Sequence, residues 1–407
     1  MMSILMHVLS MRREEWMDRD SLEEAQKNKL EGILRCAGDT GYYSRHLGIV
    51  PAADAARDLS LLPVLEKDRI RSDPLLFIRR GADMRSLDAH RTSGTTGIPI
   101  TIYTDRAESL QRIAIVHFHE ISQGRSPFGL FADISRESYA PHSFVLFRKL
   151  KIDSREPEEA IYEKIARNRP EMIKGYPSIL AMLARMNKKI RPKSIIACGE
   201  TLTPGARKLI GDSFSCPVLD YYGAWEFRSV AWECPEEGRM HVNSSTLKVE
   251  IVDHKGRPKK HGKGNIVVTS LYNRTMPLIR YGLGDTGSWG KDCPCGRGYP
   301  VLGSFEGRNP VLIRLPSGKT HPAISLGILD IDAAVSEITQ YQIIQEREDL
   351  FVLRYCGSEL TERTKDEITA DMRKACLGEE IRLEFEHVER IPRGRTGKIE
   401  RVVSKVR

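Results

Sequence analysis

The chain has 407 residues, of which 40% are hydrophobic and 29% are charged, and its formal net charge is +8. This length and apolar content allow a large buried core and more than one domain, and the mixing of both charges along the chain excludes wholesale disorder. An excess of basic residues suits bound anions such as nucleotides, but the Lys and Arg are scattered rather than clustered with aromatic residues. An ordinary basic surface explains them equally well, and nucleic-acid binding is not expected.

The first residues, MMSILMHVLSMRREEWM, are apolar at the start but have no basic segment before the apolar run and no small-residue cleavage site. They predict an extension or a first helix rather than a signal peptide. No run of about eighteen apolar residues occurs, so no transmembrane span is expected. The eight Cys favour a cytoplasmic location with reduced thiols, where close Cys pairs indicate a metal site rather than disulfides.

Helical spacing of apolar residues predicts helices over 17–37 and over 105–120, the second capped by Asp105. Helical and short β-rich runs then alternate. The expected helices are EEAIYEKIARN, YPSILAMLARMNKK and TPGARKLIGDSF, and the expected strands are EMIKG, KSIIACG and CPVLDYYG. This alternation predicts the α/β class, with a mainly parallel sheet flanked by helices and with ligands at the carboxyl ends of the strands.

From residue 240 on, the pattern changes to the strands TLKVEIVD, GNIVVTS and GSWG, joined by Gly-rich turns, which predicts a β-rich subregion. After GSFEGRNP, three further strand-like runs and one amphipathic helix predict a small α+β domain. We therefore expect a large domain over 1–306 and a small one over 307–407.

Residues 92–97, TSGTTG, form a polar run between a short extended segment and the alternating run ITIYT. Hydroxyls and backbone N–H groups on such a turn make a concave anion site. It is not a Walker A loop, because no Gly-Lys-Ser/Thr follows and a strand rather than a helix comes next. By itself the run indicates a polar hairpin turn more often than a phosphate site.

Three further segments follow it in a fixed order: DYYGAWEF at 220–227, MPLIRYGLGDTGSW at 276–289 and RIPRGRTGKIERV at 390–402. Together the four segments resemble the core motifs of the adenylate-forming superfamily of acyl-CoA synthetases and adenylation domains. The chain is most similar to the short phenylacetate–CoA ligase-like branch, and within it to proteins of capsular polysaccharide biosynthesis. The resemblance implies a nucleotide- and acyl-binding domain over 1–306 and a mobile lid over 307–407.

The resemblance implies ATP-dependent activation of a carboxylic acid, in which the acid attacks the α-phosphate and pyrophosphate leaves. Positioning and charge stabilisation dominate such chemistry. Glu226 would hold Mg²⁺, Tyr222 would stack on adenine and Asp285 would accept hydrogen bonds from the ribose. Lys398 would neutralise charge at the α-phosphate, and Thr96, in the loop that would hold the β- and γ-phosphates, is the third implied catalytic residue beside Glu226 and Lys398. The full set of implied ATP-binding residues is Ser93, Gly94, Thr95, Thr96, Gly97, Gly199, Glu200, Tyr221, Tyr222, Gly223, Asp285, Arg308 and Lys398.

Cys234 and His241 of ECPEEGRMH and Cys293 and Cys295 of CPCGR offer three thiolates and an imidazole. Such a set fits a tetrahedral zinc with no ligand position left for catalysis, so a structural zinc is predicted. The alternative is four unrelated residues, two of them buried thiols.

The chain departs from the family at the acid pocket and at the phosphate loop. Ile98 stands where the loop usually has Lys, and QGRSPFGLFADISRESYAPHSF replaces a Gly-rich aromatic segment. Phe118, Tyr139 and Trp225 are the candidate pocket residues, which would suit an aromatic or other flat acid, although all three could simply belong to the core.

The hinge departs as well. GRNPVLIRLPSG lacks the pair of Asp that relatives carry after Gly-Arg, and Pro310 would stiffen a pivot. The acceptor therefore stays open among CoA, an amine, a hydroxyl and a carrier-protein thiol. Two other functions also stay open: an adenylyltransferase that leaves AMP on a hydroxyl substrate, and a nucleotide-binding relative that has lost turnover.

Overall fold

The computed structural model describes residues 2–48, 50–91, 100–135, 146–186, 189–306, 312–322, 331, 335, 337–392 and 400–406. The chain forms two compact units, each made from two stretches of sequence. The first comprises Met1–Gly124 and Tyr221–Arg308, and the second comprises Arg125–Asp220 and Asn309–Arg407. No helix within the described ranges has both the length and the apolar character needed to cross a membrane.

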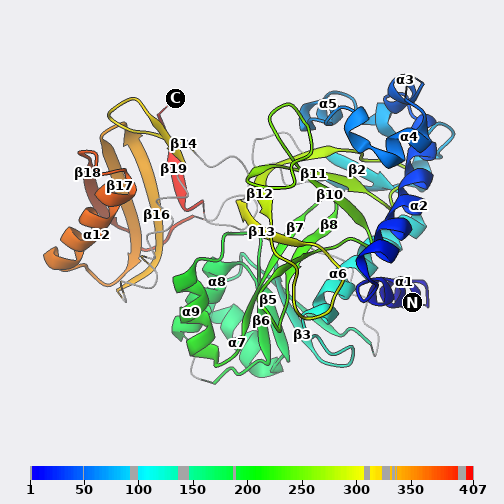
Figure 1. The fold of residues 1–407 in the computed structure, drawn as a ribbon. Coiled ribbons are helices and arrows are strands. Elements are labelled where there is room, and N and C mark those ends of the chain that lie inside the picture. Colours follow the sequence, from blue (N-terminus) through cyan, green and yellow to red (C-terminus); the bar gives the residue numbers. More distant parts are fainter. Residues whose placement is uncertain are drawn as a thin grey trace. The chain divides into compact units, whose positions relative to one another are not determined.

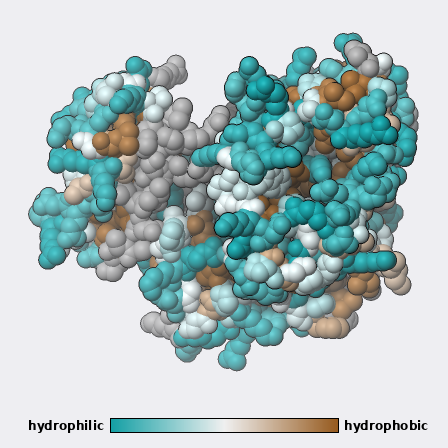
Figure 2. Space-filling model, in the orientation of Figure 1, coloured by the Kyte–Doolittle hydropathy of each residue, from teal (hydrophilic) through white to brown (hydrophobic). Residues whose placement is uncertain are grey.

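Helices make up most of the N-terminal part of the first unit, drawn in blue and cyan in Figure 1. They are α1 (Met2–Glu14), α2 (Arg19–Gly38), α3 (Tyr43–Leu47), α4 (Ala52–Arg57), α5 (Lys67–Ser72) and α6 (Arg106–Ser122), with short 3₁₀ turns at Leu59–Leu61, Pro74–Phe77 and Met84–Ser86. Figure 2 shows a mostly hydrophilic surface with apolar patches over this helical region. The side chains of Leu61, Leu75 and Leu76 are among the exposed apolar ones.

Both helices predicted here are present, and Asp105 caps the second one as predicted. Asp18 accepts a hydrogen bond from the N–H of Ser21 before α2, and Asp105 forms a reciprocal capping box with Glu108 before α6. The second oxygen of Glu108 also accepts from the N–H groups of Arg274 (2.6 Å) and Thr275 (2.9 Å). This carboxylate therefore ties the start of α6 to a distant loop of the same unit.

An antiparallel sheet forms the rest of the first unit. Its strands run in the order β10 (Leu247–Val252), β11 (Gly264–Ser270), β12 (Tyr281–Trp289), β13 (Val301–Glu306), β9 (Met240–Val242), β8 (Arg228–Glu233) and β7 (Val218–Ala224). The predicted β-rich subregion is confirmed, whereas β8 was not predicted because its six residues are all buried and show no alternation. A separate hairpin pairs β1 (Asp88–Arg91) with β2 (Thr101–Thr104).

The second unit contains a parallel sheet in the order β4 (Lys149–Asp153), β3 (Phe131–Ser135), β5 (Met172–Gly175) and β6 (Ser194–Cys198). Its helices are α7 (Glu158–Asn168), α8 (Pro177–Met186) and α9 (Pro204–Phe214), drawn in green in Figure 1. Their apolar faces and the sheet share one core that includes Ile173, Leu180 and Ile210. The predicted α/β class is confirmed.

Among the described residues, the C-terminal part of the second unit contains a four-stranded sheet and the helix α12, drawn in orange and red in Figure 1. The strand order is β18 (Arg382–His387), β17 (Leu350–Gly357), β16 (Ile338–Arg347) and β19 (Val402–Ser404), the helix is α12 (Glu362–Ala375), and β14 (Leu312–Arg314) pairs with β15 (Thr320–Pro322). This is the predicted α+β pattern. The division of the chain at residues 306 and 307 stays a prediction.

Candidate nucleotide site and cysteine cluster

Tyr222 and Asp285, which lie far apart in the sequence, meet in the first unit. The hydroxyl of Tyr222, on β7, donates a short hydrogen bond to the carboxylate of Asp285, on β12. Both side chains are buried, and the Tyr222 ring stacks on Phe305 with 4.7 Å between the ring centroids. The structure thus brings together an aromatic ring and a carboxylate that the sequence assigns to adenine and ribose.

Glu226 lies in the turn between β7 and β8 and is only 3% exposed. Its Oε1 accepts a hydrogen bond from the Tyr281 hydroxyl at 2.6 Å, while its Oε2 is buried and has no hydrogen-bond partner among the described residues. A buried carboxylate oxygen without a partner is costly unless a cation or donor completes it. This arrangement fits a hard divalent cation such as Mg²⁺.

The backbone of the Glu226 turn is held from α6. Arg112, which is 1% exposed, donates through its two terminal nitrogens to the carbonyl oxygens of Glu226 (2.8 Å) and Trp225 (2.7 Å). Because a guanidinium has a planar fork of donors, two such bonds fix the turn in one orientation. Arg112 therefore positions the candidate Mg²⁺ ligand through its main chain.

The segments that flank the Thr/Gly run pair in the β1–β2 hairpin. Arg91 pairs with Thr101, and the predicted strand ITIYT is confirmed. At the base of the hairpin, the ring of His90 lies 2.8 Å from the Thr104 hydroxyl. Burial lowers the pKa of His90 to about 4, and the positive charges of Arg112 and Arg228 lower it further in the same direction. These charges favour an anion near the loop.

Gly199 and Glu200 follow β6 in the second unit. Gly199 has φ +78°, a left-handed conformation that glycine adopts without strain. The Glu200 carboxylate accepts hydrogen bonds from the backbone N–H (3.0 Å) and the hydroxyl (3.1 Å) of Ser178 at the start of α8. Glu200 therefore has a clear structural role at a helix N-terminus, where a negative charge is favourable.

The described pocket candidates differ in their surroundings. Phe118 is fully buried and packs edge-on against Trp232 and Tyr299, so it contributes to the core of the first unit. Trp225 is half-buried, and the guanidinium of Arg228 lies 4.2 Å from its ring centroid. Their roles in binding an acid stay predictions. Several predicted site residues lie outside the described ranges: Ser93, Gly94, Thr95, Thr96, Gly97, Tyr139, Arg308 and Lys398.

The four predicted metal ligands come together in the first unit. The ligand atoms of Cys234, His241, Cys293 and Cys295 all lie within 4.8 Å of one another. Nδ1 of His241 lies 3.4 Å from the Tyr299 carbonyl oxygen and Nε2 lies 3.4 Å from the Cys295 sulfur, so the ring presents Nε2 to the thiols. Burial lowers the pKa of His241 to about 4, which keeps the ring neutral. Three thiols and a neutral imidazole in this arrangement fit zinc.

Comparisons with known proteins reveal similar sequences and a similar fold. Residues 322–405 match the family "CapK C-terminal domain". The chain is 26% identical to Protein CapK of Staphylococcus aureus over 256 residues, which cover 56% of this chain and 54% of that protein. It is 30% identical to phenylacetate-coenzyme A ligase of Thermus thermophilus over 194 residues, 44% of this chain and 43% of that enzyme. The chain spans about half the length of the curated relatives it matches.

Among solved structures, 2-hydroxyisobutyryl-CoA ligase in complex with 2-HIB-AMP superposes with a TM-score of 0.81 at 20% identity, covering 97% of this chain and 92% of that one. These matches in sequence and in fold support the assignment of the chain to the adenylate-forming superfamily. The resemblance and the fold predicted from the sequence are thereby confirmed. The match to CapK also agrees with the branch of this superfamily that the motifs favoured.

Sequence reasoning missed two residues that orient the superfamily motifs here, Tyr281 and Arg112. Tyr281 stands four residues before Asp285 in LIRYGLGD and was treated as part of an apolar run. Arg112 is a basic residue between apolar ones on an otherwise ordinary amphipathic helix. Its complete burial is the informative feature, and that becomes visible only once α6 packs on the β7–β8 turn.

Replacing Gly223 by Ala is expected to lower the free energy of unfolding by about 1–3 kcal/mol and to weaken ATP binding. A Cβ at this position would lie 2.8 Å from the Arg228 carbonyl oxygen and 2.8 Å from the Tyr221 ring, which is itself stacked on His119. Urea unfolding and ATP titration measure both effects. Gly32→Ala in α2 is the control, because a Cβ there meets only one side-chain atom, at 3.7 Å, and should be neutral or stabilising. Equal free energies of unfolding and equal ATP affinities for Gly223→Ala and Gly32→Ala would contradict the packing argument.

Proposed function

We propose that this chain is an ATP-dependent ligase that activates a carboxylic acid as an acyl-adenylate with release of pyrophosphate. The observation that carries the proposal is the buried Glu226 carboxylate, whose Oε2 has no partner among the described residues, in the same unit as the Tyr222–Asp285 pair. Relatives of the chain support it, since the superposed ligase is described in complex with an acyl-AMP. The acceptor of the acyl group is one of CoA, an amine, a hydroxyl or a carrier thiol.

In this proposal each described side chain has one task. Glu226 holds Mg²⁺ through Oε2 while Tyr281 fixes Oε1, and the ion supplies charge neutralisation at the phosphates. The Tyr222 ring lies beside adenine with its hydroxyl engaged by Asp285. The Asp285 carboxylate accepts a hydrogen bond from the ribose. The loop 93–97 holds the phosphates, and residues 307–407 act as a mobile lid that carries Lys398.

We further propose that Cys234, His241, Cys293 and Cys295 hold one structural zinc ion. The donor set is closed, with four protein ligands and no position for water, so the ion contributes folding energy rather than catalysis. The cluster joins the end of β8, strand β9 and the turn between β12 and β13. A zinc ion at this position would hold together strands that pair with β7 and β12, which carry Tyr222 and Asp285.

The first experiment is incubation of the protein with ATP, Mg²⁺ and a broad library of carboxylic acids, with hydroxylamine as a surrogate acceptor. Pyrophosphate release together with hydroxamate formation from one class of acid is the expected result. The mass of the product separates this activity from adenylyl transfer, because AMP would stay on the product of an adenylyltransferase. ATP binding without pyrophosphate release across the library would contradict the ligase proposal.

Replacing Lys398 by Ala is expected to lower the rate of pyrophosphate release about a hundredfold or more, with ATP affinity nearly unchanged. A positive charge that acts on the α-phosphate contributes mainly in the transition state, and its loss therefore appears in kcat. Lys405→Ala is the matched control, since Lys405 pairs with Glu346 at the surface and has no role in the proposal. Normal turnover in Lys398→Ala would overturn the assigned role of this residue.

A further inference from the structure

The turn that carries two of the clustered cysteines packs directly on the junction of the first two helices. The N–H of Gly298 donates to the carbonyl oxygen of Glu15 at 3.0 Å, and the Arg297 guanidinium lies 4.6 Å from the ring centroid of Trp16. Both segments belong to the first unit. The N-terminal helices are thus held at the same turn that carries Cys293 and Cys295.

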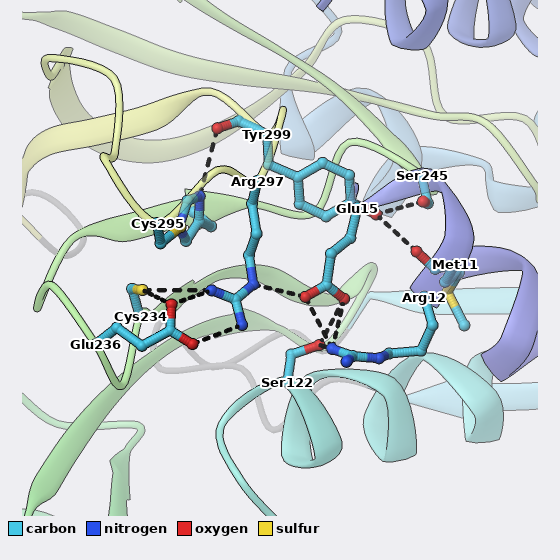
Figure 3. A network of polar contacts seen from close by, with 11 residues as sticks. Met11, Arg12, Glu15, Ser122, Cys234, Glu236, Ser245, Cys295, Arg297 and Tyr299 are labelled. Atoms are coloured by element: carbon cyan, nitrogen blue, oxygen red, sulfur yellow. Dashed lines mark hydrogen bonds and ion pairs between the residues drawn. The ribbon is translucent and has the colours of Figure 1, made fainter. Parts of the chain in front are cut away.

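Arg297 links the thiols to this junction, as Figure 3 shows. Its side chain is 4% exposed, and it donates through Nε to Glu15 Oε1 at 2.7 Å. One terminal nitrogen lies 3.7 Å from the Cys234 sulfur and also donates to Glu236 at 2.9 Å. A single buried guanidinium therefore contacts a candidate zinc ligand on one side and a carboxylate from the N-terminal region on the other.

Glu15 is fully buried and depends on this contact. Its side chain is 0% exposed and accepts hydrogen bonds from Arg297, from Arg12 at 2.9 Å and from the Ser122 hydroxyl at 2.9 Å. A buried carboxylate is stable only while its charge is paired and its oxygens are satisfied. Withdrawal of Arg297 would leave Glu15 with one charged partner instead of two.

The charge of a zinc-bound cluster connects the Arg297–Glu15 pair to the metal. Three thiolates and a neutral imidazole around a divalent cation leave one negative charge in excess, which the nearby Arg297 offsets. A cation that fixes the Cys234 sulfur would also fix the atom that the Arg297 guanidinium contacts at 3.7 Å. Residues hydrogen-bonded to metal ligands orient them and raise metal affinity.

We propose that zinc in the Cys₃His cluster and the docking of the N-terminal helices stabilise each other through Arg297 and Glu15. The inference rests on the proposed zinc site and adds a function for it: the metal fastens residues 11–19 to the turn at 292–299. Because coupling between two binding events is reciprocal, the docked helices also retard loss of the metal. Arg297 and Glu15 are positioning residues in this arrangement, not ligands.

The steric fit of the turn supplies an independent way to test the coupling. A Cβ at Gly298 would lie 1.9 Å from the Met17 carbonyl oxygen, so only glycine lets the turn approach the helix junction this closely. Gly298→Ala therefore separates the two segments without altering any charge or any ligand. An exposed ion pair between Arg19 and Asp292 joins the same segments, with side chains 45% and 80% exposed, and supplies a matched control.

The first test uses the unaltered protein. Amide hydrogen exchange is compared before and after zinc is removed with a chelator, and zinc content is measured in parallel. Exchange within residues 11–22 is expected to rise about tenfold or more on zinc removal, while exchange in α7 stays constant as an internal reference. Unchanged exchange in residues 11–22 after complete zinc loss would overturn the coupling.

The second test measures the rate of zinc transfer to a chromogenic chelator from Glu15→Gln, Arg297→Lys, Gly298→Ala and the control Arg19→Gln. Glu15→Gln and Gly298→Ala are expected to release zinc about 10–100-fold faster than the unaltered protein. Arg19→Gln should release zinc at the rate of the unaltered protein. Arg297→Lys keeps the positive charge but not the forked set of donors, so its rate of zinc release should lie between that of the control and that of Glu15→Gln. Cobalt in place of zinc gives a spectroscopic check, because loss of the contact to Cys234 should shift the thiolate-to-cobalt absorption.

These measurements separate the two proposals. A protein that contains no zinc and takes up none overturns the metal assignment and the coupling together. One zinc per chain that leaves Glu15→Gln and Gly298→Ala at the rate of the unaltered protein overturns the coupling alone.

Discussion

Replacing Glu226 by Gln is expected to lower the rate of acid-dependent pyrophosphate release about a hundredfold or more and to raise the Mg²⁺ concentration needed for half-maximal rate. Gln keeps the size of the side chain and an oxygen for the Tyr281 hydroxyl, which donates to Glu226 at 2.6 Å. It removes the negative charge that a hard cation requires. A titration of the initial rate with Mg²⁺ measures the effect.

Tyr281→Phe is the matched control for this variant. It deletes the hydroxyl that fixes Glu226 Oε1 but leaves the carboxylate. The rate of pyrophosphate release is therefore expected to fall less, by about tenfold. Thermal unfolding of both variants verifies that the fold is retained. A Glu226→Gln protein with the Mg²⁺ dependence of the unaltered enzyme would remove Glu226 from the metal site and weaken the proposed function.

The second large effect is expected at the cysteine cluster. Cys293→Ser should abolish retention of one zinc ion per chain and lower the free energy of unfolding by about 4 kcal/mol or more. The cluster lies between β8, β9 and the β12–β13 turn, so its ligands hold together parts of the chain that only the folded sheet brings into proximity. Metal analysis by mass spectrometry and denaturant unfolding measure the two quantities.

Cys36→Ser is the control for the cluster. Cys36 lies on α2, is half-exposed and is not among the clustered ligands, so its replacement should leave zinc content and stability nearly unchanged. ATP binding by Cys293→Ser at low temperature should persist while the protein stays folded, because the cluster is structural in this proposal. Retention of a full zinc equivalent by Cys293→Ser would contradict the ligand assignment.

Local sequence signals predicted much of this fold correctly. The amphipathic runs predicted α2 and α6, and Asp105 predicted the start of α6, since a cap and an apolar stripe are properties of neighbouring residues. The alternation of short β-rich runs with helices predicted β5 and β6 of the parallel sheet for the same reason, whereas β3 and β4 were not predicted. β8 was not predicted, because a strand that is buried on both faces shows no alternation of apolar and polar residues.

The candidate site was predictable where a motif is short and contiguous. The order of the Thr/Gly loop, DYYGAWEF and RYGLGD indicated the superfamily and named Tyr222, Glu226 and Asp285. Cysteine spacing likewise indicated which four residues would gather. These signals depend on residue type and on distance along the chain, and both are read without coordinates.

The sequence by itself determined the α/β class, the superfamily and the identity of the motif residues, because helix caps, hydrophobic periods and contiguous motifs are local. Only the tertiary structure decided which buried groups support them. Arg112 reaches the Glu226 turn across 114 positions and Arg297 reaches Glu15 across 282 positions of the chain. A buried charge is stable only beside its partner, and no local pattern states where a distant partner will lie until the core has packed.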